Sequence, residues 1–224
     1  MDNPQHDSHE AERSAALREQ LYLLSRHSTT VYAGTLVVSV LMIVALYTRV
    51  EPVRITGWVG LVWLLTAARI GISRWMHGRD RTYRLTRFWT TFFVAGSFLS
   101  GLLWGSAGVL FFEAEDPLLV AFVLIILAGM TAGSVASLSS YGPAYVAFAV
   151  PAMLPVGVRL LFETGGTHTV LGIGALVFLM VNLSYSRNTQ AMVKETIKLR
   201  FENLDLLETL QSPALLRKRL IRGG

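Results

Sequence analysis

The chain has 224 residues, of which 52% are hydrophobic and 16% charged, and it contains no cysteine. Soluble domains carry about 25% charged residues, so this composition favours a membrane protein, and the missing cysteines exclude disulfides and thiolate metal sites. The formal net charge of +5 is interpreted first as membrane topology, because Lys and Arg collect on the cytoplasmic side. Nucleic-acid binding is not expected, since the basic residues do not alternate with exposed aromatic residues on one face.

Residues 1–29 are polar and of mixed charge. They lack the apolar core of a signal peptide, so we expect a cytoplasmic N-terminal segment. Within it, the sequence HDSHE at residues 6–10 holds two histidines and two acids that could bind a transition metal. A solvated tail explains the same residues, and we predict no metal site and no cofactor.

Six apolar runs follow, over residues 30–186. A helix needs about 20 mostly apolar residues to cross a bilayer, and its backbone groups are then bonded internally. We therefore predict an all-α, polytopic membrane domain of six transmembrane helices. The predicted spans cover residues 30–48, 56–73, 89–112, 117–137, 142–162 and 169–186.

The placement of charged residues predicts the orientation of these helices. Residues 74–87 carry five arginines and the segment after the sixth run is also basic, whereas the turn after the third run reads EAED. Lys and Arg mark cytoplasmic loops, so both termini are predicted to lie in the cytoplasm. Arg69, near the end of the second run, is expected to extend its side chain toward that same face.

Small residues recur every four positions in two of the runs. One row contains Ser97, Gly101 and Gly105, and the other contains Gly129 and Gly133. Membrane helices associate by close packing at such residues, so both rows are expected to be sites of helix packing.

The fifth run contains two interior prolines, Pro151 and Pro155, which each remove an N–H donor and are expected to kink the helix. Pro143 should lie in its first turn, where proline fits well. Packing alone accounts for these residues, and the functional alternative is a bundle that shifts between two arrangements. Trp104 and Tyr145 either line a pocket within the membrane or are packed or lipid-facing aromatic residues.

No catalytic centre is predicted. The sequence has no phosphate-binding glycine-rich loop and no G-x-S-x-G motif. The predicted spans carry no ionisable residue away from their ends, which argues against ion-coupled transport but leaves a carrier of neutral substrates open. Glu163 and His168, in the turn before the sixth run, are candidates for sensing pH or a metal, with ordinary polar residues as the alternative.

Residues 187–211 have the pattern of a cytoplasmic helix. A parallel coiled coil between two copies of the chain would bury its apolar stripe, so we expect a homodimer in which this segment is a signalling helix. The alternative is a helix that docks on its own bundle or on the membrane surface. The apolar residues at the a and d heptad positions are Val193, Ile197, Leu204 and Leu207.

Four stretches of the chain resemble a known family. They are residues 19–47, SGLLWGSAGVLFF at 100–112, AGMTAGSVASLSSYGPAYVAFAVPAMLP at 128–155 and LRFENLDLLETLQ at 199–211. Over residues 18–211 the chain resembles the six-helix membrane sensor region of bacterial histidine kinases, often of hybrid type, and the similar region of membrane diguanylate cyclases. The resemblance implies a multi-pass protein of the bacterial inner membrane that works in signal transduction, with a kinase or cyclase output domain as its partner.

The C-terminal residues depart from that family. Gln211 is followed by no histidine that could accept a phosphoryl group and by no GGDEF motif, and the sequence closes with SPALLRKRLIRGG at residues 212–224. Pro213 is expected to end the helix. This basic tail is explained either by binding to anionic lipid or by a truncation or frameshift, with the output domain lost or encoded downstream.

The sequence therefore predicts a sensory and dimerisation module, in contact with membrane lipid, that has no catalytic domain of its own. Two other functions stay open. One is a small transporter or channel, and the other is a membrane scaffold that holds a partner protein by its cytoplasmic helix.

Overall fold

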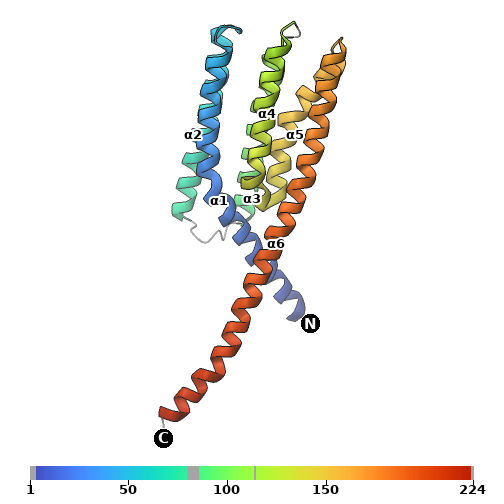
Figure 1. Ribbon diagram of the computed structural model, residues 1–224. Coiled ribbons are helices and arrows are strands. Elements are labelled where there is room, and N and C mark those ends of the chain that lie inside the picture. Colours follow the sequence, from blue (N-terminus) through green and yellow to red (C-terminus); the bar gives the residue numbers. More distant parts are fainter. Residues whose placement is uncertain (1–3, 80–85, 114, 223–224) are drawn as a thin grey trace.

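The computed structural model describes residues 4–79, 86–113 and 115–222. Within its helices, the side chains of residues 4–14, 26–30, 77, 79, 201, 204–205 and 208–222 lie outside the described part. All regular elements of the described residues are helices (Figure 1). In chain order they are α1 (Pro4–Leu46), α2 (Pro52–Arg79), α3 (Thr86–Leu110), α4 (Pro117–Leu138), the short 3₁₀ helix η1 (Ser139–Tyr141), α5 (Gly142–Phe162) and α6 (Gly166–Arg222).

Four helical stretches of the described chain are long and apolar enough to cross a membrane: Pro52–Met76, Thr86–Leu110, Pro117–Phe162 and Gly166–Arg200. A further apolar stretch in α1, Val31–Leu46, is shorter. The chain is thus an all-helical protein with the apolar helices of a membrane protein.

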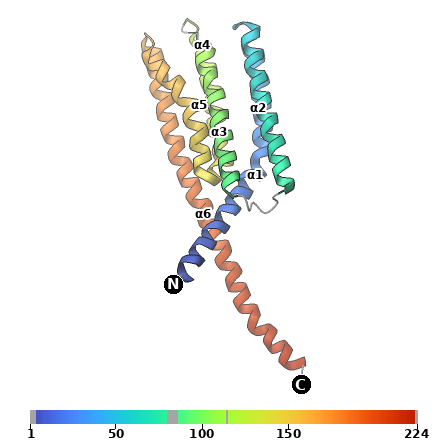
Figure 2. The ribbon, with the colours of Figure 1, turned by 180° about the vertical axis from the view of Figure 1, so that it is seen from behind.

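The stretch Pro117–Phe162 is not one straight helix. It contains α4 and α5, which run side by side in opposite directions and are joined by η1 (Figures 1 and 2). The reversal ends at Tyr141, whose extended backbone (φ −130°, ψ 94°) precedes α5. Pro143 lies in the first turn of α5, as predicted, where no helical acceptor is available for an N–H.

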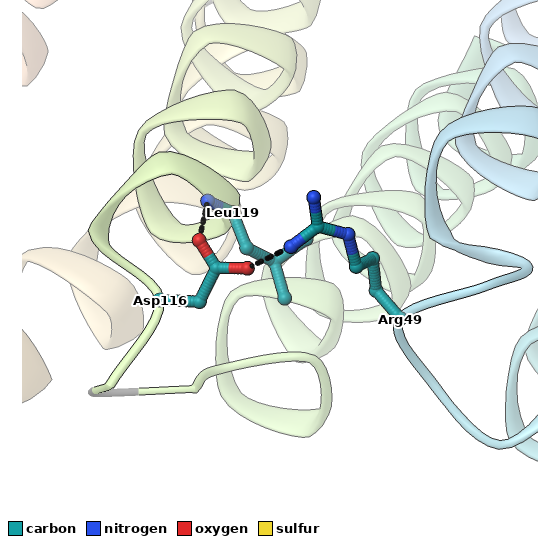
Figure 3. Close-up of polar contacts among 3 residues, drawn as sticks. All are labelled: Arg49, Asp116 and Leu119. Atoms are coloured by element: carbon teal, nitrogen blue, oxygen red, sulfur yellow. Dashed lines mark hydrogen bonds and ion pairs between the residues drawn. The ribbon is translucent and has the colours of Figure 1, made fainter.

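Asp116 explains why α4 begins at Pro117. One carboxylate oxygen, Oδ1, accepts a hydrogen bond from the backbone N–H of Leu119 at 3.1 Å and so caps the helix (Figure 3). The other oxygen, Oδ2, lies 2.7 Å from Nη1 of Arg49. Arg49 lies in the turn between α1 and α2, so one carboxylate connects that hairpin to the start of α4.

The core is built around α5. Helices α3 and α6 pack along α5, α4 contacts both α5 and α6, and the α1–α2 hairpin lies beside this group (Figures 1 and 2). Trp89, Phe93 and Trp104 of α3 and Tyr145 of α5 are among the largest fully buried side chains. These aromatic residues belong to one buried hydrophobic core, and the glycines described below set how closely α3 approaches α5.

Both chain termini lie at the same end of the bundle, and the turns that follow α1, α3 and α5 lie at the other end (Figure 1). Beyond the bundle, α1 and α6 cross (Figures 1 and 2). There Nη1 of Arg200 in α6 lies 2.8 Å from Oε1 of Glu19 in α1. The first and last helices are therefore in contact outside the apolar part of the bundle.

Helix α6 continues from Gly166 to Arg222, so the prediction that Pro213 ends the helix is wrong. An interior proline removes one hydrogen bond and costs roughly 3 kcal/mol. The residues on both sides are mostly Leu, Arg and Glu, which favour helix. Their preference keeps the backbone helical through the proline.

Candidate functional site

A cavity of about 270 Å³ lies between helices α1 to α5. Its wall is mostly apolar, with contributions from Val31, Met130, Leu138 and Phe148. Polar groups reach it from α2 and α3 through Arg69, Ser97 and Ser100. A charged side chain therefore shares a confined space with apolar neighbours.

Arg69 is the charged residue of this cavity. It is only 9% exposed, and it lies about two helical turns before the end of the apolar stretch Pro52–Met76. Its Nη1 donates to Oγ of Ser100 at 2.8 Å, and its Cζ lies 5.6 Å from the ring centre of Tyr32. The expectation that Arg69 extends toward the membrane surface is therefore wrong, because its side chain points into the bundle.

Gly96 makes room for this guanidinium group. A Cβ added to Gly96 would lie 2.8 Å from Nε of Arg69, so a larger residue would displace the side chain. Arg69 forms no ion pair with any acid of the described chain, and its Nε is buried without a hydrogen-bond partner. An ionisable group inside an apolar helix is costly, and such groups mark functional sites.

Two hydroxyl groups near Arg69 also lack partners among the described residues. They are Oγ of Ser97, which lines the cavity, and Oη of Tyr32, whose ring faces the guanidinium group. Buried polar atoms in proteins almost always have a hydrogen-bond partner. Two of the residues with unpaired polar atoms, Arg69 and Ser97, line the cavity, which indicates a place where polar atoms of a ligand or of water are accommodated.

Trp104 forms part of the cavity wall and is 1% exposed. Its ring meets that of Trp58 edge-on, with the ring centres 5.1 Å apart. The indole N–H of Trp58 in turn donates to the carbonyl oxygen of Leu103 at 2.9 Å. Trp58, held by this hydrogen bond, fixes the orientation of the Trp104 ring.

Tyr145 is fully buried but is not part of the cavity wall. Its hydroxyl group lies 3.5 Å from the carbonyl oxygen of Thr131 in α4. Of the two aromatic residues considered as pocket-lining, the structure therefore places Trp104 at the cavity and Tyr145 between α4 and α5.

Gly129 and Gly133 of α4 line the cavity together with Gly34 of α1. All three are exposed, and a Cβ added to any of them would meet no described atom within 4 Å. The close packing expected at Gly129 and Gly133 is therefore not seen among the described residues. Because these residues have no side chain, they leave the cavity open toward the surface between α1 and α4.

The other row of small residues lies where α3 meets α5. A Cβ at Gly101 would overlap the carbonyl oxygen of Phe148, and a Cβ at Gly105 would overlap that of Pro151. These two glycines let the helix backbones touch. Ser97, one turn earlier in α3, lines the cavity instead.

Both interior prolines lie within α5. Because Pro155 has no N–H, the carbonyl group of Pro151 lacks its usual helical donor. That carbonyl oxygen is the one that faces Gly105. The proline and the glycine are therefore parts of one contact between α5 and α3.

Glu163 and His168 lie around the turn between α5 and α6. Oε1 of Glu163 lies 3.8 Å from Nε of Arg159, and Cζ of Arg159 lies 4.2 Å from the ring centre of Phe112. His168 packs against the same Phe112, with ring centres 6.2 Å apart, and its Nε2 is buried without a described partner. Glu163 and His168 are thus connected only indirectly, through Arg159 and Phe112, and no hydrogen bond joins these two described side chains.

The residues expected in the signalling helix all lie on α6. Val193 is partly buried, Ile197 is buried, Leu207 is exposed, and the side chain of Leu204 lies outside the described part. Ile197 precedes Arg200, which contacts Glu19 of α1. Part of the predicted stripe is therefore near α1 of the same chain.

The described residues contain no group of three or more His, Asp or Glu side chains that could hold a metal ion. The side chains of the HDSHE sequence at residues 6–10 lie outside the described part.

Arg69, Ser100 and Gly34 are among the cavity residues that the sequence analysis did not select as candidates for a site. The signal for Arg69 was a single arginine within an otherwise apolar stretch. The signal for its surroundings was weaker, because Gly96 and Ser100, four residues apart in α3, look like any other small residues in a membrane helix.

Comparison of the chain with models of protein families, with curated proteins and with solved structures found no match.

Proposed function

We propose that the chain is the six-span sensory module of a membrane signalling receptor, in which α6 carries changes in the packing of the bundle into the cytoplasm. In this topology, α4 and α5 count as two spans because they reverse at η1, and Val31–Leu46 supplies the first. The shorter first span fits a bilayer if the polar ends of α1 lie at the headgroups.

Charge supports cytoplasmic termini. The end of α2 and the start of α3 lie at the same end of the bundle as the termini (Figure 1), and they carry Arg74 and Arg87. Asp116 lies in the turn after α3, at the opposite end. Basic residues collect on the cytoplasmic side, so this distribution of charge supports termini in the cytoplasm.

The observation that carries the proposal is the continuity of α6 from Gly166 to Arg222. Within the bundle, Oγ of Ser186 in α6 lies 2.6 Å from Oγ of Ser139 in η1, and both residues are buried. A Cβ on Gly142 would come 2.5 Å from the side-chain oxygen of Gln190. Helix α6 is thus fitted closely to the segment that directly follows the cavity-lining end of α4.

The proposed receptor works as a homodimer, with a kinase or cyclase as the output partner. Leu199, Leu206 and Leu207 of α6 are 51%, 60% and 54% exposed, and a second copy of α6 would cover them. Such a pair of helices transmits a change of packing only if a ligand, lipid state or partner stabilises one arrangement more than the other.

The test joins the complete chain to the dimerisation helix and catalytic domain of a histidine kinase. Residues are inserted one at a time at the junction through one heptad repeat. We expect autophosphorylation in membranes to rise and fall with the helical period. A matched series with a Gly-Ser linker at the junction should show no such variation.

Equal kinase activity in every register of the helical series would contradict the proposal. The bundle would then be an anchor or a scaffold.

The cavity also favours a second candidate function, a carrier of small organic anions, because Arg69 supplies one buried cation. Uptake of labelled acetate into proteoliposomes, above the uptake of labelled glycerol and above that of empty liposomes, would support this function. Equal uptake of both solutes would argue against it.

A further inference from the structure

The cavity around Arg69 has the features of a binding site for a specific class of ligand. It contains one cationic side chain, which has no acidic partner in the described chain. Burying an unpaired charge is unfavourable, whereas a charge paired with a hydrogen-bonded counterion is tolerated. An anion in the cavity would supply the missing partner.

The charge balance restricts this anion to a single negative charge. Arg69 is the one ionisable residue among the described residues that line the cavity. A dianion such as a phosphate monoester would leave one buried charge uncompensated. A carboxylate carries one charge, and its two oxygens match the planar donor geometry of a guanidinium group.

Donors for such a head group line the same cavity. Nη1 of Arg69 donates to Ser100, while Nε of Arg69 and Oγ of Ser97 are buried and unpaired. A carboxylate between Arg69 and Ser97 would accept hydrogen bonds from side chains that otherwise have too few acceptors.

The rest of the cavity is suited to an apolar chain. Trp104 and Phe148 of its wall are buried, and Met130 and Leu138 extend the apolar surface. The volume of about 270 Å³ lies just below the range of about 300–1,000 Å³ that is usual for drug-sized ligands. The ligand is therefore small, with a short hydrocarbon chain.

The opening of the cavity indicates how this ligand arrives. The exposed residues Gly34, Gly129 and Gly133 border it on α1 and α4. No described atom lies within 4 Å of a Cβ added to any of them. In the six-span topology this side faces lipid, so a molecule dissolved in the membrane reaches the cavity between α1 and α4.

We propose that the cavity enclosed by helices α1 to α5 binds a monoanionic amphiphile, a carboxylate with a short apolar chain, which pairs with Arg69. This ligand enters from the lipid between α1 and α4. The proposal rests on the proposed membrane function and names the ligand class of that sensory site.

The test measures binding of radiolabelled decanoate to the full chain in nanodiscs of phosphatidylcholine, with empty nanodiscs subtracted. We expect saturable binding of one decanoate per chain. Arg69→Gln should weaken it by about tenfold or more, since the head group loses its charged partner. Arg74→Gln, which removes an exposed arginine of the same helix, should bind as the wild type does.

A second pair of variants tests the opening and does not depend on the stability of Arg69→Gln. Gly133→Leu adds a side chain at the border of the cavity, and Gly174→Leu adds one on α6 away from it. Neither residue has a described atom within 4 Å of an added Cβ, so both variants should fold. We expect Gly133→Leu to weaken decanoate binding by about tenfold and Gly174→Leu to leave it unchanged.

Competition tests the choice of head group. Unlabelled decan-1-ol should displace decanoate about tenfold less well than unlabelled decanoate does. Equal displacement by the alcohol would overturn recognition of an anion. Loss of decanoate binding in nanodiscs that contain phosphatidylglycerol would overturn the proposal in favour of a lipid phosphate. Absence of saturable binding to the folded wild-type chain would overturn it outright.

Failure of this proposal can be distinguished from failure of the proposed function. Binding of decanoate without any dependence of kinase activity on helical register would leave the ligand site intact and remove the signalling function. Register-dependent kinase activity without decanoate binding would support the signalling function and remove the ligand site.

Discussion

The carbonyl oxygen of Pro151 in α5 lies so close to Gly105 of α3 that a Cβ on residue 105 would overlap it. Pro155 provides no N–H to this carbonyl group, and the Cα–H of a glycine on a neighbouring helix is a weak donor at such contacts. The proline at position 155 thus leaves the carbonyl oxygen of Pro151 without a helical donor. The Cα–H of Gly105 on the neighbouring helix can donate weakly to that oxygen. Gly105, expected at a site of helix packing, and Pro155, expected to kink α5, therefore act at the same contact.

This contact predicts a large difference between two Gly→Ala variants. Gly105→Ala should lower the free energy of unfolding by about 1–3 kcal/mol, because the methyl group must push α5 away. Gly129→Ala should be neutral or stabilising, since no described atom lies within 4 Å of its Cβ and alanine favours helix by about 1 kcal/mol. Thermal unfolding in detergent, followed by circular dichroism, measures both. Equal losses of stability would contradict the contact.

Asp116 has two partners, and two substitutions separate their effects (Figure 3). Asp116→Ala removes both the cap of α4 and the ion pair, and the cap alone should be worth about 0.5–2 kcal/mol. Asp116→Asn keeps a capping oxygen and loses only the charge. The ion pair with Arg49 should contribute at most about 1 kcal/mol, because the Arg49 side chain is 56% exposed.

We therefore expect Asp116→Asn to retain most of the stability that Asp116→Ala loses in thermal unfolding. The small remaining loss should shrink as salt is added, since salt screens exposed charges. An Asn variant as unstable as the Ala variant would show that the ion pair, not the cap, provides most of the stability that Asp116 contributes.

The hydrogen bond between Ser139 and Ser186 predicts an asymmetry between single and double variants. Both residues are buried, and their Oγ atoms lie 2.6 Å apart. Ser186→Ala should cost about 1–3 kcal/mol, because Ser139 then keeps a buried hydroxyl group without that partner. The double variant with Ser139→Ala also removes the orphaned group and should recover part of the loss. Additive losses in chemical or thermal unfolding would argue against a direct hydrogen bond.

The contact between Glu19 and Arg200 predicts a cross-link within one chain. The sequence has no cysteine, so Glu19→Cys combined with Arg200→Cys gives two thiols without background. A short bis-maleimide should join them inside a monomer, because the two side chains meet in the same copy at 2.8 Å. Covalent dimers on a denaturing gel, in place of a monomer of altered mobility, would show that α1 contacts α6 of a second copy instead. A control with Glu19→Cys and Leu61→Cys should give no cross-link.

The helical class of the fold could be predicted because apolar runs of the right length leave few alternatives for the backbone. The sequence could not predict which faces of the helices contact one another. Gly101 and Gly105 have the same spacing as Gly129 and Gly133, yet the first pair touches α5 and the second borders the cavity. Spacing along one helix defines a face but does not say which neighbour, if any, lies opposite to it.

Arg69 illustrates the same limit for the candidate site. Its position near the end of an apolar run suits a side chain that reaches the membrane surface. Whether it turns inward depends on Gly96 and Ser100 of another helix, which provide space and a hydrogen-bond acceptor. The direction of the Arg69 side chain therefore depends on residues far away in the sequence, and the residues next to Arg69 do not predict it. Trp104 was predicted as a possible pocket residue. Its orientation in the cavity wall likewise depends on a residue of another helix, Trp58 of α2.

Helix α1 touches two distant parts of the molecule. At Gly34 it borders the cavity, and at Glu19 it meets α6 beyond the bundle. These two residues are about 22 Å apart along a helix that rises 1.5 Å per residue. A tilt of α1 by about 5° near the cavity would therefore move Glu19 sideways by about 2 Å. Binding of the proposed ligand beside Gly34 would thus be coupled to the position of α6, because the same rigid helix contacts Arg200 through Glu19.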